Sequence, residues 1–437
     1  MRAIFLVAFL FALPAMAFAA PRHGRAPHHR SHPAPAAQQA PAPAAATAAA
    51  DGGDALTTLQ TNAQYAVVMD FDTGALLFSK GGDELMKPAS MAKLMTVSIL
   101  FEKLKHGDVK LEDKFLVSEA AWRQGMTEKS EGSKMFVQVG DSITVEDLIR
   151  GIVIQSGNDA CIVVAEHFAG SEESFAALMN AEAKRMGLQH STFANSNGLP
   201  DPRQNVSAHD LALLARYIIK EFPQYYHYFS EKDFTWSKIT QPNRNLLLTS
   251  YPGADGLKTG HTAESGYGMT ASAVQDGRRL IVVVNGLKGE NDRLAEVKRL
   301  FDFGFREFKT YALLKPGDVV GEATVWAGET HSVPLTVKQP VNIMLRRASR
   351  PGLKVTLKYD EPLVPPIDRG KPLGSLLITA PGAPDMTVPV YAAAPVESGG
   401  VMTYMRVGAQ ALVMGKAEMQ TAEDTESATE APANGSK

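Results

Sequence analysis

The segment that most constrains the fold is an apolar run that begins directly after Pro88. Proline is tolerated in the first turn of a helix and the run has the length of a helix, so we predict a helix that begins at or next to Ser90. Almost all of its side chains are apolar, and a helix that is apolar on most sides belongs inside a core. The chain is therefore expected to build a large core around this helix.

Two polar side chains, Ser90 and Lys93, stand three residues apart at the start of this predicted helix. That spacing places both on one face, one turn apart. Burial is costly for a hydroxyl and an amine that lack partners, and it lowers the pKa of a lysine. Because a neutral lysine can take the proton of a neighbouring serine, the pair predicts Ser90 as a nucleophile and Lys93 as its base.

Two further short motifs follow in order, Ser156-Gly157-Asn158 and Lys258-Thr259-Gly260. Ser-x-x-Lys alone is a loose pattern, but three ordered matches separated by long gaps are specific. The set is the signature of penicillin-binding proteins and serine β-lactamases. The chain has no Gly-x-Ser-x-Gly segment, which argues against a hydrolase with a Ser-His-Asp triad.

Composition excludes several other classes of protein. The 437 residues suffice for two or three domains, and a net charge of −3 gives no indication of a nucleic-acid partner. The single cysteine, Cys161, excludes an intrachain disulfide and a cysteine-type zinc site. Within its apolar helical run we interpret Cys161 as a small core residue.

The N-terminal region predicts export. Residues 1–19 combine one positive charge, an apolar stretch and small residues, and we predict a signal peptide cleaved after Ala19. Residues 20–55 are rich in Pro, Ala and His and are predicted to form a disordered linker. Its histidine cluster is interpreted as a solvated tail rather than a loose metal site.

Periodicity and turn residues predict the remaining elements coarsely. A hairpin is expected at 65–79, surface loops and short strands at 104–140, and a loop at 195–202. Thr144 is expected to cap a helix that runs to Ile154, with Ser156 in the turn that follows. Other expected helices are 160–167, 175–186, 210–219 and 293–308, and expected strands are 256–259, 268–274 and 279–285.

The C-terminal third changes character. Short β-rich runs with Pro and Gly turns predict a small β-sandwich over residues 313–393. Residues 394–416 predict an amphipathic helix, and its apolar face over 401–414 suits peripheral contact with a membrane or docking on its own protein. Residues 417–437 are acidic and predicted to be disordered.

From about Ala55 to Tyr391 the chain resembles the low-molecular-mass penicillin-binding proteins that act as D-alanyl-D-alanine carboxypeptidases. The resemblance includes the three motifs and the stretches 241–247 and 255–262. It implies an α+β fold, with a helical cluster beside a helix-covered antiparallel sheet over residues 56–312 and the active site between them. The all-β sandwich domain follows.

The resemblance also implies roles for single residues. Ser90 would attack the penultimate D-alanine of a peptidoglycan stem peptide, Lys93 would be the base, and Ser156 would pass a proton to the leaving amine. Asn158 would hold substrate and lysine in place, and Lys258 would add positive potential. The terminal carboxylate would bind Thr259 and Arg244, and backbone N–H groups of Ser90 and His261, next to Gly260, would form the oxyanion hole.

No metal or cofactor is implied, and the implied ligands are peptides ending in D-Ala-D-Ala and β-lactam antibiotics. The implied location is the periplasm, peripheral on the outer face of the inner membrane. Three alternatives remain open at this point: a serine β-lactamase, a peptidoglycan DD-endopeptidase, and a peptidoglycan-binding scaffold without activity.

Overall fold

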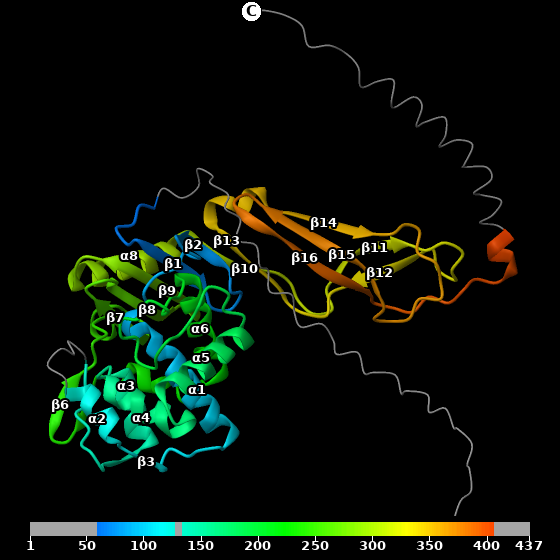
Figure 1. The fold of residues 1–437 in the computed structure, drawn as a ribbon. Helices are drawn as coiled ribbons and strands as arrows, with labels where there is room; N and C mark the ends of the chain where they lie inside the picture. The colour runs from blue at the N-terminus through cyan, green and yellow to red at the C-terminus, as the bar shows by residue number, and fades with distance from the viewer. Residues whose placement is uncertain (1–58, 127–132, 406–437) are drawn as a thin grey trace, which may run out of the picture. The chain divides into compact units, whose positions relative to one another are not determined.

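A computed structural model describes residues 59–126 and 133–405 (Figure 1). The predicted signal peptide, the linker up to residue 55 and the acidic tail lie outside the described residues. Among the described residues, no helix combines the length and apolarity needed to cross a membrane.

A five-stranded antiparallel sheet forms the centre of the N-terminal part, in the order β2-β1-β9-β8-β7. Its strands are β1 (Tyr65–Asp70), β2 (Leu76–Lys80), β7 (Ala254–Thr262), β8 (Gly266–Gln275) and β9 (Arg278–Leu287). The predicted hairpin at 65–79 is confirmed, and the expected strands 268–274 and 279–285 pair with each other as β8 and β9. Strand β7 is longer than the expected 256–259 and lies at the edge of the sheet.

Alternating side chains of β9 divide the sheet between two cores, as the period of a strand requires. Ile281 and Val283 belong to the core of the helical cluster, whereas Val282 and Val284 belong to a second core with α8 (Glu290–Glu307). Figure 1 shows α8 covering one face of this sheet. The expected helix-covered antiparallel sheet is therefore confirmed.

The helical cluster surrounds the predicted central helix. A 3-10 turn, η1 (Ala89–Ala92), leads into α1 (Lys93–His106), ten of whose residues are buried. Around it lie α3 (Val145–Val153), α4 (Asn158–Ala169), α5 (Glu172–Met186) and α6 (Ala208–Glu221). Thr144 caps α3 by accepting from the Asp147 N–H, as its sequence pattern predicts.

Several elements were not expected. The polar segment 104–140 contains a helix, α2 (Glu119–Met126), besides the short strand β3 (Lys114–Leu116), which pairs with β4 (Ser142–Thr144). A turn η2 (Tyr226–Ser230), a hairpin of β5 (Asp233–Trp236) and β6 (Ile239–Pro242), and the short α7 (Leu247–Ser250) complete this part.

The C-terminal part is β-rich, as predicted. It contains β10 (Phe308–Leu314), β11 (Val319–Thr324), β12 (Ser332–Thr336), β13 (Val341–Arg346), η3 (Arg347–Gly352), β14 (Lys354–Tyr359), β15 (Pro372–Ala380) and β16 (Ala383–Ala392). A sheet in the order β11-β12-β16-β15-β14 and the pair β10-β13 share one apolar core, the arrangement of a small sandwich. Because β10 pairs with β13, the β-rich part includes residues before 313. Residues 401–405 are helical, and the rest of the expected 394–416 helix beyond 405 lies outside the described residues.

Candidate active site

Ser90 and Lys93 lie within hydrogen-bond distance, with 3.0 Å between Ser90 Oγ and Lys93 Nζ. Both belong to the η1–α1 junction, where the chain starts as a 3-10 turn before it becomes an α-helix. In a 3-10 turn the side chains of residues i and i+3 eclipse each other, so this local geometry brings the amine directly over the hydroxyl. Lys93 is fully buried, whereas Ser90 is partly exposed and open to an incoming molecule.

Two further oxygens surround the Lys93 amine. Nζ lies 2.7 Å from Asn158 Oδ1 and also donates to the backbone carbonyl of Asn197. Burial lowers the pKa of Lys93 to about 8. Among the charged and titratable side chains that interact with it, some raise this pKa and others lower it. A substantial fraction of this lysine is therefore neutral slightly above pH 7.

The second motif lies in the turn between α3 and α4. Ser156 adopts a left-handed conformation with φ 62°, which non-glycine residues rarely do. Its Oγ is buried and has no hydrogen-bond partner among the described residues. Asn158, the first residue of α4, brings its side-chain oxygen to Lys93. The turn thus joins the second motif to the first.

The third motif lies on the edge strand β7. A Cβ built on Gly260 would stand 2.8 Å from the Pro88 carbonyl oxygen, so only glycine lets this strand lie so close to η1. Lys258 is buried, and its burial together with the charge of Lys93 holds its pKa well below the usual value. Thr259 is also buried, whereas His261 is exposed and its ring stacks on that of Tyr267.

The positive charge of Arg244 contributes to lowering the pKa of Lys93 and of Lys258. Its guanidinium donates to Ser133 Oγ. The flanking Asn243 and Asn245 are buried and their side chains bond backbone groups on both sides, which fixes the main chain around an exposed arginine. The nine residues predicted for the site thus lie in the η1–α1 junction, in the turn from α3 into α4, on strand β7 and, for Arg244, between β6 and α7.

Two contacts at the candidate site were missed by sequence reasoning. The first is the backbone carbonyl of Asn197. Every residue has a backbone carbonyl, so the sequence does not indicate which one contacts Lys93, and residues 195–202 were predicted only as a loop. Asp159 was not singled out, although its buried carboxylate accepts backbone N–H groups of Met135, Phe136 and Ala160. It thereby fixes the segment from which Ser133 meets Arg244.

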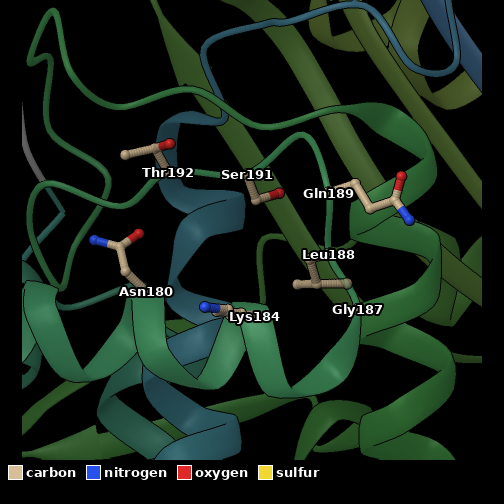
Figure 2. A pocket seen from close by; sticks show the side chains of 7 residues that line it. All are labelled: Asn180, Lys184, Gly187, Leu188, Gln189, Ser191 and Thr192. Atoms are coloured by element: carbon tan, nitrogen blue, oxygen red, sulfur yellow. The ribbon is translucent and has the colours of Figure 1, made fainter.

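Figure 2 shows a cavity whose lining includes none of these residues. Its volume is about 690 Å³, and it is lined by Asn180 and Lys184 of α5 and by Leu188, Gln189, Ser191 and Thr192. None of the predicted site residues lines it. In the described part of the chain, no group of three or more His, Cys, Asp or Glu side chains is arranged to hold a metal ion.

The chain is similar to known proteins over most of its length. A family model described as D-alanyl-D-alanine carboxypeptidase matches residues 50–289, and one described as penicillin-binding protein 5, C-terminal domain, matches residues 308–398. The chain belongs to the D-alanyl-D-alanine carboxypeptidase family. It is a serine-type carboxypeptidase, a hydrolase of the penicillin-binding class.

The similarity to curated relatives extends over most of their length. The chain is 39% identical to D-alanyl-D-alanine carboxypeptidase DacC of Escherichia coli over 341 residues, 78% of this chain and 85% of that one. It is 34% identical to DacF of Bacillus subtilis, over 81% and 91% of the two chains. Penicillin-binding protein 5 of Haemophilus influenzae has a similar structure, with a TM-score of 0.69, 34% identity and coverage of 78% of this carboxypeptidase and 100% of that chain.

Proposed function

We propose that this carboxypeptidase removes the terminal D-alanine of peptidoglycan stem peptides through an acyl-enzyme on Ser90, with Lys93 as the base. One observation carries the assignment: Lys93 Nζ faces Ser90 Oγ, Asn158 Oδ1 and the Asn197 carbonyl together. A neutral amine has two N–H groups and one lone pair. Because the two Asn oxygens can only accept, they take both N–H groups, and the lone pair is left for the Ser90 proton.

The reaction then follows from the surrounding groups. Ser90 Oγ bonds to the carbonyl carbon of the penultimate D-alanine while its proton passes to Lys93. The developing oxyanion accepts from backbone N–H groups of Ser90 and His261, each worth about 3 kcal/mol. The peptide C–N bond breaks as Ser156 gives its proton to the leaving amine, and the proton held by Lys93 replaces it, which leaves Lys93 neutral again. Water then attacks the ester while Lys93 takes a proton from it, and this proton returns to Ser90 Oγ as the ester C–O bond breaks.

The terminal carboxylate is the feature that an exopeptidase must recognise. Arg244 and Thr259 bind it, since a guanidinium suits the planar geometry of a carboxylate. Burial and neighbouring positive charges lower the pKa of Lys258. The negative charge of the bound substrate carboxylate would raise this pKa and favour the ammonium form. Asn158 keeps its amide nitrogen directed to the substrate while its oxygen holds Lys93.

Timed release of free D-alanine from a synthetic pentapeptide, with and without penicillin, tests the proposal. Ser90→Ala is expected to abolish both D-alanine release and the covalent penicillin adduct. Ser98→Ala is a matched control on the same helix, because the Ser98 hydroxyl is buried and has no partner to lose among the described residues. Retention of either activity in Ser90→Ala would contradict the assignment.

The reaction products distinguish the proposed carboxypeptidase from an endopeptidase, a β-lactamase and a binding scaffold. Cleavage of a cross-linked dimer but not of the pentapeptide would indicate an endopeptidase, and rapid turnover of penicillin would indicate a β-lactamase. A wild-type protein that forms no adduct would favour a binding scaffold.

We also propose that residues 1–19 direct export to the periplasm and that residues 401–414 contact the membrane surface. Val401, Met402 and Met405 support the second part, because these apolar side chains are exposed on the described end of the segment. An exposed apolar helix face suits the interface of a lipid bilayer.

A further inference from the structure

The third oxygen at Lys93 is a backbone carbonyl, and its position depends on the loop that carries it. This loop, residues 194–204, lies within the connection between α5 and α6 and brings the Asn197 carbonyl to Lys93 Nζ. The position of a backbone carbonyl is set by the main chain around it, so contacts of the neighbouring residues must hold it in place. The residue before it, Ser196, is fully buried and has such contacts.

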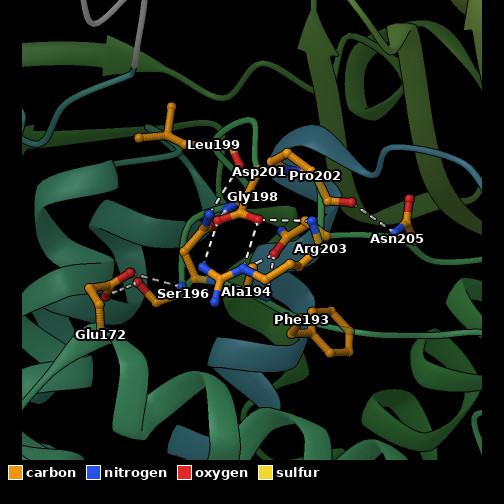
Figure 3. A network of polar contacts seen from close by, with 12 residues as sticks. Glu172, Phe193, Ala194, Ser196, Gly198, Leu199, Asp201, Pro202, Arg203 and Asn205 are labelled. Atoms are coloured by element: carbon orange, nitrogen blue, oxygen red, sulfur yellow. Dashed lines mark hydrogen bonds and ion pairs between the residues drawn. The ribbon is translucent and has the colours of Figure 1, made fainter.

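Glu172, the first residue of α5, grips Ser196 with both carboxylate oxygens (Figure 3). Oε1 accepts from Ser196 Oγ at 2.6 Å, and Oε2 accepts from the Ser196 backbone N–H at 3.0 Å. On the other side, the Thr96 hydroxyl of α1 donates to the Ser196 carbonyl at 2.6 Å. Ser196 is therefore fixed between α5 and α1, and the next carbonyl along the chain is the one that Lys93 uses.

The rest of the loop has anchors of its own. Lys87 Nζ donates to the carbonyls of Asp201, Pro202 and Gln204, each at 3.1 Å. The Gln204 side chain accepts from the backbone N–H of Ala194 at 2.7 Å. These contacts do not involve Glu172. Loss of Glu172 would therefore remove two hydrogen bonds at Ser196 and leave the rest of the loop attached.

We propose that Glu172 is a positioning residue for the acylation step, because its two-oxygen grip on Ser196 holds the Asn197 carbonyl against Lys93. The inference rests on the proposed role of Lys93 as the base. Glu172 touches neither Ser90 nor the substrate and acts only through the loop. A carboxylate is the suited group, since it can accept two hydrogen bonds from one residue at once.

The carboxylate has a second effect, through its charge. The charged and titratable groups that interact electrostatically with Lys93 are Cys161 and Asp159 of α4, Arg244, Lys258 of β7 and Glu172 itself. Burial and Arg244 lower the pKa of Lys93, while Cys161, Asp159 and Glu172 raise it. Removal of the Glu172 charge should therefore move the titration of Lys93 to lower pH.

The test measures the rate at which a fluorescent penicillin acylates Ser90 between about pH 6 and 9.5, per active site counted by the final adduct. Glu172→Ala should lower the rate at high pH about tenfold or more, since a misplacement of about 1 Å can cost 100-fold. Glu172→Gln keeps an acceptor but no charge, and its rate should rise with pH at a lower midpoint than that of the wild type. Glu173→Gln is the matched control, an exposed neighbour in the same helical turn with the same charge change, and should match the wild type.

A purely structural role would lower the melting temperature and the fraction of acylated protein but leave the rate per active site and its pH midpoint unchanged. That result overturns the proposal. If Glu172→Ala fails to fold, Glu172→Gln decides, and a rate per active site at high pH and a pH midpoint that both equal those of the wild type overturn the proposal. A wild type without adduct would instead refute the proposed function.

Discussion

At the scale of single residues, the protonation of Lys93 is the property on which the chemistry depends. The amine must be neutral to take a proton, yet it lies among oxygens that favour its charged form. Burial dominates and lowers the pKa from 10.5 to about 8. The base is therefore mostly protonated at pH 7 and becomes mostly neutral above pH 8.

The pH dependence of acylation should report this titration. Because a lysine gains its lone pair as the pH rises, the rate of penicillin acylation should increase about tenfold between about pH 7 and 9. Stopped-flow measurement of the adduct gives the profile. Lys93→Arg should lose the rise and fall about 100-fold or more in rate, because a guanidinium stays charged over this range. A wild-type rate that does not change over this range would contradict the role of Lys93.

At the scale of elements, the site depends on how closely the loop 194–204 and strand β7 approach the 3-10 turn that carries Ser90. Gly198 follows Asn197 with φ 81°, and a Cβ built on it would stand 1.9 Å from the Ala89 carbonyl oxygen. No side chain fits there unless the loop moves. The contact therefore couples the position of the Asn197 carbonyl to the turn of the nucleophile.

Gly198→Ala should lower both stability and the acylation rate, because the added methyl group pushes the loop away from Ala89. Gly187→Ala is the matched control: Gly187 has φ 78°, but its Cβ would meet nothing within 4 Å. The control should lose only about 1–2 kcal/mol for its backbone conformation and keep its acylation rate. Urea unfolding and penicillin binding measure the two effects, and equal behaviour of the variants would contradict the close approach.

The sequence predicted the elements whose signal is local. Pro88 and the apolar run placed the helix of Ser90, and the cap at Thr144 placed the turn of Ser156. The β5–β6 hairpin was missed because its turn residues, Ser237 and Lys238, adopt positive φ without the usual Gly or Asn. Strand β7 was predicted too short, since its polar motif residues do not look like a buried strand although Lys258 and Thr259 are buried.

The candidate site was predictable as far as side-chain types define it. Lys93 lies at Ser90 and at Asn158 of the second motif, and Gly260 of the third motif lies against Pro88. The Asn197 carbonyl and its support by Glu172 do not appear in any sequence pattern. They depend on a backbone position and on a contact between residues 24 positions apart, which only the packed loop establishes.

At the scale of the whole molecule, catalysis and membrane contact are assigned to separate parts of the chain. The predicted site residues lie between Ser90 and His261, whereas the exposed apolar side chains near residue 401 belong to the C-terminal end of the described chain. The two properties should therefore be separable by truncation.

Removal of residues 401–437, which spares the core residue Val396 of the sandwich, should abolish retention on phospholipid vesicles and leave the rate of penicillin acylation unchanged. Each apolar side chain that enters the interface contributes about 1.5 kcal/mol or more, so the loss should be visible in co-sedimentation. Equal retention of the full-length and truncated proteins would contradict membrane contact through this segment.

The unpartnered hydroxyl of Ser156 bears on the choice of inhibitors. A compound that presents an acceptor atom to it completes a contact without disrupting an internal one. An analogue of the same shape that lacks this atom leaves a buried donor unsatisfied, at a cost of about 1–3 kcal/mol, or roughly five- to 150-fold in affinity. Discrimination between otherwise similar drugs at this crevice can therefore come from a single heteroatom.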